Sequence, residues 1–67
     1  MADTIKLKQE IAKSGLKTSV LCERIGMSPQ LLHKRLTGNG EFTVSQAQAL
    51  SDALRLTSAQ FKEIFFA

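Results

Sequence analysis

Few side chains of this chain could support covalent chemistry. Cys22 is its one cysteine and His33 its one histidine, and the stretch Gly38–Gly40 is not followed by the Lys-Ser/Thr pair of a phosphate-binding loop. A catalytic nucleophile needs a base beside it, and Cys22 lies in a helical pattern of apolar residues that indicates a small core residue. A chain of 67 residues also buries too small a core to enclose a deep catalytic pocket. We therefore predict that the protein is not an enzyme and holds no metal ion and no cofactor.

Charged side chains are distributed unevenly along the chain, whose net charge is +3. Segment 1–38 holds seven basic and three acidic residues and carries +4, whereas segment 39–67 holds two basic and three acidic residues and carries −1. This contrast suggests one surface for a polyanion such as nucleic acid, and another for packing or for a protein partner. Because solvated lysines on helices would give the same asymmetry, charge alone does not identify the partner.

The sequence carries no signal for export or for a membrane. A single cysteine excludes an internal disulfide and favours a reducing compartment. No apolar run approaches the ~18 residues that a membrane span needs, and Met1–Glu10 is charged where a signal peptide would be apolar. We therefore expect a cytoplasmic protein with no membrane partner.

Helices are the elements predicted to position these side chains. Apolar residues recur at spacings of three and four, and runs typical of β-strands are absent. Five short helices are expected, with starts at Asp3 or Thr4, Thr18, Ser28-Pro29, Thr43 and Thr57. Gly15 and Gly26 are the expected ends of the first two helices. The predicted fold class is therefore all-α, a compact bundle of five short helices in a single domain, 1–67.

One stretch of this pattern predicts a particular pair of helices. A small residue, Cys22, lets two helices approach each other, and Gly26 makes a tight turn between them. Met27, Leu32 and Leu36 then pack the second helix across the first, which predicts a helix-turn-helix at about 18–37. The sequence here resembles the lambda repressor-like, Cro-like helix-turn-helix family, in particular the short regulators of phages and prophages. The resemblance runs from Leu7 to Phe66 and rests on Gly15-Leu16, Ile25-Gly26-Met27-Ser28, Lys34-Arg35-Leu36-Thr37-Gly38, Glu41-Phe42-Thr43 and Ile64-Phe65-Phe66.

The resemblance implies a sequence-specific DNA-binding transcriptional regulator that reads the major groove with its third helix. Carried onto this chain, the base-reading positions are Ser28, Pro29, Gln30, His33 and Lys34. Gln30 can bind adenine through two hydrogen bonds, and Lys34 can meet guanine or a phosphate. The expected phosphate contacts are the first N–H groups of the second and fourth helices, joined by Thr18, Ser19, Thr37, Asn39 and Thr43. The implied partner is double-stranded DNA, bound by a homodimer in the bacterial cytoplasm or nucleoid and encoded by a bacterium or a phage.

Two positions depart from the family pattern. The second helix starts with Lys17-Thr18 where the family usually has Thr-Gln, and a lysine side chain cannot cap a helix. We expect the cap to move to Thr18 or Ser19, and Lys17 to supply charge to a phosphate. Leu31 lies beside the inward-facing Leu32 and is expected to be partly exposed. A thymine methyl contact, packing against the second helix and a protein contact all suit Leu31, the protein contact most.

The phenylalanines near the end of the chain, Phe61, Phe65 and Phe66, admit two interpretations. They are either an apolar surface through which two copies pair or the closure of a monomeric core. They also support a competing hypothesis for the whole protein. In that hypothesis the same fold is a protein-interaction module, which uses Leu31 and these phenylalanines to bind a phage or host protein rather than DNA.

Overall fold

Five α-helices and no strand make up residues 2–66, which are the part of the chain that the computed structural model describes. The helices are α1 (Thr4–Ser14), α2 (Thr18–Ile25), α3 (Pro29–Leu36), α4 (Val44–Leu54) and α5 (Ser58–Phe65). The predicted all-α fold class and the expected position of each helix are confirmed. The longest helices have 11 residues, and within residues 2–66 none is long and apolar enough to cross a membrane.

Side-chain oxygens and glycines define where most of these helices begin and end. Four of the five helices begin at a residue whose side-chain oxygen accepts a hydrogen bond of 3.0–3.1 Å from the backbone N–H three residues later. These N-caps are Asp3, Ser28, Thr43 and Thr57. Each bond satisfies an N–H group that has no partner within its own helix. Gly15 and Gly26 end α1 and α2 in the left-handed conformation, which a residue without Cβ adopts at no steric cost.

One apolar core holds the five helices together. Its fully buried side chains are Leu7 of α1, Leu21 of α2, Leu50 of α4 and Ile64 of α5, and α3 adds the buried Leu32. Cys22 is only 4% exposed, so the prediction of a small core residue is confirmed. Burying one such leucine or isoleucine side chain stabilises the fold by roughly 1.5–3 kcal/mol.

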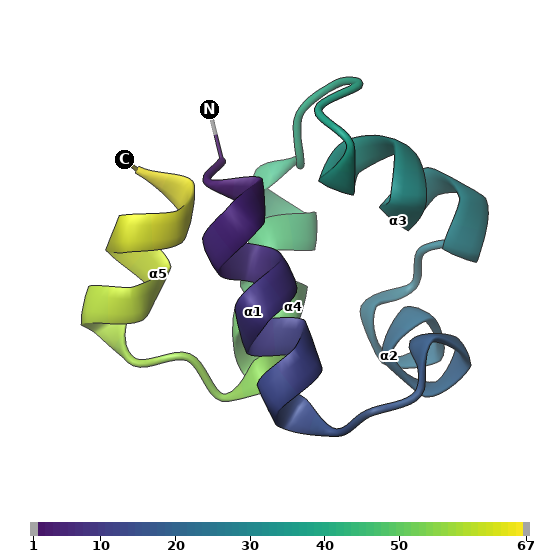
Figure 1. Ribbon diagram of the computed structural model, residues 1–67, viewed down its shortest axis with the longest axis horizontal. Coiled ribbons are helices and arrows are strands. Elements are labelled where there is room, and N and C mark those ends of the chain that lie inside the picture. Colours follow the sequence, from purple (N-terminus) through teal and green to yellow (C-terminus); the bar gives the residue numbers. More distant parts are fainter. Residues whose placement is uncertain (1, 67) are drawn as a thin grey trace.

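The helices divide the molecule into two ends around α1. Figure 1 shows α1 crossing the middle with α4 behind it, α5 on one side, and α2 and α3 on the other. α1 packs against α3, α4 and α5, and α2 packs against α3 and α4. This arrangement leaves the outer surfaces of α2 and α3 at one end of the molecule and that of α5 at the other.

Arg55 ends α4 in the left-handed conformation, at φ 55°, and it is the one residue other than glycine within 2–66 that has a positive φ. A Cβ makes this conformation costly. We expect Arg55→Gly to stabilise the protein by about 1 kcal/mol, which corresponds to a rise in Tm of roughly 4–8 °C for a domain of this size. Thermal unfolding followed by circular dichroism measures the change. Arg55→Ala is the matched control, and an equal rise for it would contradict the backbone explanation.

Candidate nucleic-acid interface

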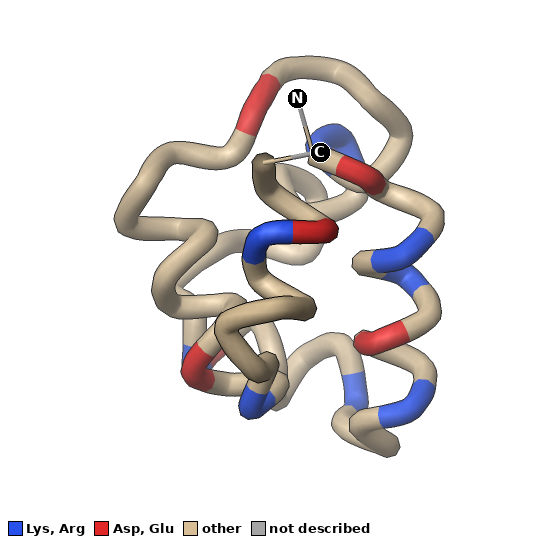
Figure 2. Tube along the Cα trace, turned by 90° about the vertical axis from the view of Figure 1, so that its left-hand side faces the viewer, with Lys and Arg blue, Asp and Glu red and all other residues tan. Residues whose placement is uncertain are grey.

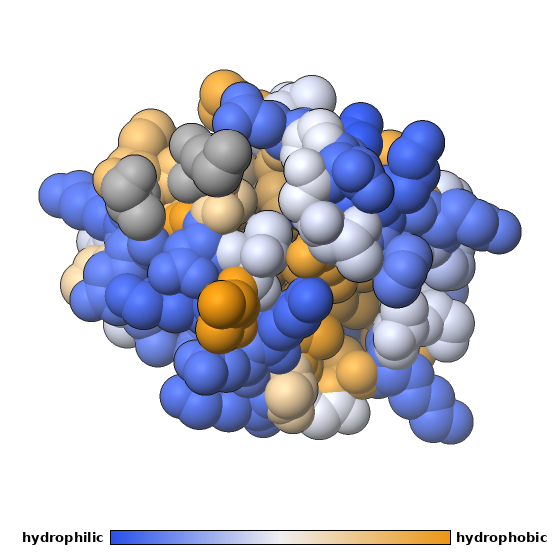
Figure 3. All heavy atoms as spheres, turned by 45° about the horizontal axis from the view of Figure 1, so that its top comes forward, coloured by the Kyte–Doolittle hydropathy of each residue, from blue (hydrophilic) through white to orange (hydrophobic). Residues whose placement is uncertain are grey.

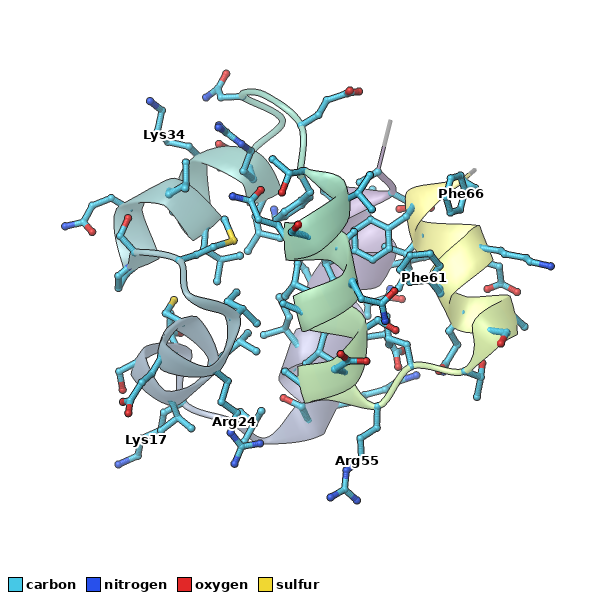
Figure 4. All side chains as sticks on the ribbon, turned by 180° about the vertical axis from the view of Figure 1, so that it is seen from behind. Lys17, Arg24, Lys34, Arg55, Phe61 and Phe66 are labelled. Atoms are coloured by element: carbon cyan, nitrogen blue, oxygen red, sulfur yellow. The ribbon has the colours of Figure 1, made fainter. Side chains whose placement is uncertain are left out.

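The start and the outer face of α3 hold the five residues predicted to read bases. Ser28, Pro29, Gln30, His33 and Lys34 are all exposed, whereas Leu32 of the same helix is buried. Because residues four apart are neighbours on a helix surface, Gln30 lies next to Lys34, and Pro29 next to His33. Gln30 and Lys34 therefore form one exposed row and Pro29 and His33 another, and Lys34 projects away from the body of the molecule (Figure 4).

The polar groups of this surface are free to meet a ligand. Within residues 2–66, the amide of Gln30 and the ammonium group of Lys34 have no hydrogen-bond or ion-pair partner. The Ser28 hydroxyl accepts a hydrogen bond from the Leu31 N–H at 3.1 Å, which leaves its own proton available as a donor. The surface thus presents an amide, an ammonium group and a hydroxyl donor, which match the acceptors and donors at the edges of base pairs.

The start of α2 differs from the other four helix starts. Lys17 takes the extended N-cap conformation, and the Leu21 N–H donates to the Lys17 carbonyl at 2.9 Å, but no side chain caps the helix. The expected shift of the cap to Thr18 or Ser19 is therefore wrong, because the helix already begins at Thr18. The first N–H groups of α2 receive no side-chain oxygen from Lys17. A helix start of this kind attracts an anion, since the N–H groups and the helix dipole both favour negative charge.

The start of α2 and the face of α3 open onto the same hollow. Thr18 at the start of α2 lines it together with Pro29 and His33 of α3, above the buried Leu32 and Leu21. The hollow has a volume of about 160 Å³ and lies between α1 and α3. Figure 3 shows this apolar area surrounded by polar side chains. Of the predicted residues, the hollow brings together the phosphate contact Thr18 and the base-reading residues Pro29 and His33, whereas Lys17, Ser19, Ser28, Gln30 and Lys34 lie outside it.

At the start of α4, two backbone N–H groups are bonded by side chains of the helix itself. The Thr43 hydroxyl accepts from the Gln46 N–H at 3.1 Å, and the Thr43 N–H donates to the Gln46 side-chain oxygen at 2.9 Å. The predicted phosphate contact at Thr43 is therefore limited to its hydroxyl proton and to the two N–H groups that follow it. Thr43 is exposed, so that proton is accessible.

The loop between α3 and α4 uses most of its donors internally. The Thr37 hydroxyl donates to the Lys34 carbonyl at 2.9 Å, and the N–H groups of residues 37, 38 and 39 all bond to carbonyls of α3. Thr37 is thus engaged in ending the helix. The Asn39 side-chain amide makes one bond, of 3.4 Å, to the Thr37 oxygen and keeps a second N–H group free. Of the two predicted loop contacts, Asn39 is the one with a free donor.

Two basic residues at the α2–α3 end, Arg24 and Arg35, had no role predicted from the sequence. Arg24 is exposed on α2 and projects outward beside Lys17, as Figure 4 shows. Arg35 of α3 turns back onto the loop, and its Nη1 donates to the Asn39 carbonyl at 2.7 Å. The positive φ of Gly40, at 90°, marks the bend that accommodates it, but a glycine in a loop is too common a signal to identify such a contact.

The positive charge of the first half of the chain does not all face this side. The Lys6 ammonium group lies 3.7 Å from Glu63 of α5, and Lys13 lies 3.3 Å from Glu10 on α1. Figure 2 shows Lys and Arg interleaved with Asp and Glu over several sides of the trace. The candidate interface therefore carries only part of the +4 charge of segment 1–38.

The phenylalanines are divided between the core and the surface at the α5 end. Phe65 is half-buried in the core and meets Phe42 edge-on, with ring centroids 6.0 Å apart. Phe66 is 73% exposed and lies 5.7 Å from the half-buried Phe61. Phe61 and Phe66 border an open groove of about 650 Å³ between α4 and α5. Core closure thus accounts for Phe65, and an apolar surface remains at Phe61 and Phe66.

The surroundings of Leu31 and of the potential metal ligands can be stated briefly. Leu31 is half-buried and packs against the core, so packing is shown, whereas a thymine or protein contact stays a prediction. Within residues 2–66, no three His, Cys, Asp or Glu side chains gather in a way that could hold a metal ion.

The absence of a cap oxygen at Lys17 can be tested by adding one. We expect Lys17→Ser to raise the free energy of unfolding by ~1 kcal/mol, because a serine oxygen at the N-cap satisfies an N–H group of the first turn. Urea unfolding measures this change. The control is Lys17→Ala, which removes the same charge without supplying an oxygen. If both variants were equally stable, the first N–H groups of α2 would already have a partner.

No protein-family model, curated protein or solved structure that was compared with the chain matches it. Three features of residues 2–66 are candidate contacts: the exposed and unpaired Gln30 and Lys34 of α3, the uncapped start of α2, and the exposed aromatic surface at the opposite end.

Proposed function

We propose that this chain is a sequence-specific DNA-binding regulator of the lambda repressor-like, Cro-like type, in which α2 and α3 form a helix-turn-helix. The observation that carries the proposal is the shared position of two features. Thr18 at the uncapped start of α2 lines one hollow together with Pro29 and His33 of α3. Gln30 and Lys34 of the same helix are exposed and have no side-chain partner within residues 2–66. An anion site next to a row of base-compatible side chains is the combination that phosphate contact and major-groove reading require.

Each part of this surface has a separate task in the proposed complex. α3 enters the major groove, where Gln30 binds adenine through two hydrogen bonds and Lys34 meets guanine or a phosphate. Ser28 and His33 add single hydrogen bonds, and Pro29 offers apolar contact. On one side of α3, the start of α2 binds a phosphate with Lys17, Thr18 and Ser19. On the other side, the free donors of Asn39 and Thr43 bind a second stretch of the DNA backbone.

We further propose that two copies pair through the surface at α4 and α5. Phe66 and Val44 are 73% and 87% exposed, and the groove beside Phe66 can receive a side chain of a second copy. The molecule is 26 Å across in its longest dimension. Successive major grooves lie ~34 Å apart, so the proposed pairing has to place the two third helices at that spacing. The same groove supports the alternative function, a module that binds another protein instead of DNA.

DNA binding is tested by selecting duplexes from a random pool and titrating the selected site at several salt concentrations. We expect affinity to fall steeply with salt, because phosphate contacts release counterions. Gln30→Ala should relax the preference at one base pair by ~1–3 kcal/mol. Lys34→Gln should weaken binding and, if Lys34 meets a phosphate, lower the slope of log K against log salt by about 1.

Lys6→Gln is the matched control for Lys34→Gln. It removes the same charge from a side chain that faces Glu63 of α5, and we expect it to leave the slope nearly unchanged. Failure to enrich any motif, with no dependence of binding on salt, would overturn the proposed function and leave the protein-interaction module.

Pairing is tested by sedimentation of the protein alone and with a selected duplex. We expect Phe66→Glu to shift the equilibrium towards the monomer, because it places a charge in an apolar contact. Ile5→Glu is the control, since Ile5 is 70% exposed on α1 and does not border the groove. A wild-type protein that stayed monomeric at all concentrations and on DNA would contradict the homodimer.

A further inference from the structure

Arg35 differs from its basic neighbours on α3 because its side chain is directed towards the protein. Lys34 is exposed, whereas Arg35 is half-buried and its Nε atom is inaccessible to solvent, with no hydrogen-bond partner within residues 2–66. Its Nη1 donates to the carbonyl of Asn39 at 2.7 Å. The guanidinium group thus contacts the loop that follows its own helix rather than projecting towards a ligand.

Gly40 provides the space that this side chain occupies. A Cβ on Gly40 would lie 2.6 Å from Nη1 and 2.9 Å from Cζ of Arg35, which is closer than atoms approach without displacement. Gly38, in the same loop and at nearly the same φ, has nothing within 4 Å of the corresponding position. The guanidinium group therefore lies directly against the backbone of Gly40 while it bonds to the residue before it.

These contacts complete the attachment of the loop to α3. The N–H groups of residues 37, 38 and 39 already bond to carbonyls of the helix, and Arg35 adds a bond to a loop carbonyl. The loop contains two glycines at positive φ, which lose much conformational freedom when they are fixed. A loop that is ordered before binding avoids that cost when a ligand arrives.

We propose that Arg35 is a positioning residue, whose guanidinium group holds the α3–α4 loop so that Asn39 meets the DNA backbone, and that Arg35 itself binds no phosphate. The inference rests on the proposed DNA-binding function. It follows from the geometry that a planar guanidinium group can cover Gly40 and bond to the Asn39 carbonyl at the same time. The ammonium group of a lysine has the charge but not the planar group that packs on Gly40 while one of its nitrogens bonds to the Asn39 carbonyl.

The test combines a variant that keeps the charge with one that blocks the contact from the other side. Arg35→Lys and Gly40→Ala should both increase the mobility of residues 38–40 in the free protein, measured by ¹⁵N relaxation and amide exchange. Both should also weaken binding to a selected duplex by about three- to tenfold, with an unchanged slope of log K against log salt. Thermal unfolding establishes that each variant is folded.

Gly38→Ala is the matched control for Gly40→Ala. It places a Cβ at the same positive φ without meeting Arg35, so the difference between the two variants measures the guanidinium contact. In a double-mutant cycle, the extra loss of affinity that Gly40→Ala causes over Gly38→Ala should nearly disappear when Arg35 is already lysine. The effect of Gly38→Ala should be the same whether residue 35 is arginine or lysine.

Three results would overturn the inference. The first is unchanged loop mobility in both variants, which is decided without DNA. The second is wild-type affinity for Arg35→Lys together with a slope lowered by about 1 for Arg35→Gln, which would make Arg35 a phosphate contact. The third is full additivity of Gly40→Ala with Arg35→Lys. A loop that loosens as expected in a protein that binds no duplex would instead refute the proposed function and leave the holding of the loop by Arg35 in place.

Discussion

Leu7, Leu21, Leu50 and Ile64 belong to one buried cluster, and each comes from a different helix. A chain of 67 residues buries only ~60% of the surface that it exposes when unfolded, so no helix can be omitted from this core. α3 contributes one buried side chain, Leu32, with support from half-buried neighbours. This burial orients the helix and directs its remaining polar side chains outward. The candidate interface therefore depends on the core, because α3 carries both the buried Leu32 and the exposed residues of the interface.

One of the five helices, α2, lacks the stabilising N-cap side chain that the others have. Four helices receive a side-chain oxygen at the N-cap, and two of these also have a complete capping box. Only α2, among the helices described, begins at a residue that cannot supply one. A departure from otherwise consistent local design is expected at a functional site, where binding of a ligand offsets the cost. The start of α2 lies beside α3, where Thr18, Pro29 and His33 line one hollow, and the proposed phosphate contact accounts for the missing cap.

The separation of polar and aromatic surfaces gives the two ends of the molecule different capacities. Lys17, Arg24 and Lys34 project from the α2–α3 end, and Phe61 and Phe66 lie at the other (Figure 4). The proposed DNA binding and the proposed pairing of two copies therefore use different side chains. The loop after α3 links this helix to α4, and the Arg35 side chain bonds to the loop at the Asn39 carbonyl.

Interactions between residues three or four apart were predictable from the sequence, because capping oxygens, glycine ends and apolar spacing act locally. The sequence by itself determined the five helices, the ends of the first two at Gly15 and Gly26, and the core position of Cys22. It did not determine the N-cap at Lys17, the division of the phenylalanines by the contact of Phe65 with Phe42, or the pairing of Lys6 with Glu63. Nor did it show that Arg35 occupies the space left by Gly40. Only the tertiary structure decided these features, since each depends on how the chain folds back on itself and not on the local spacing of residue types.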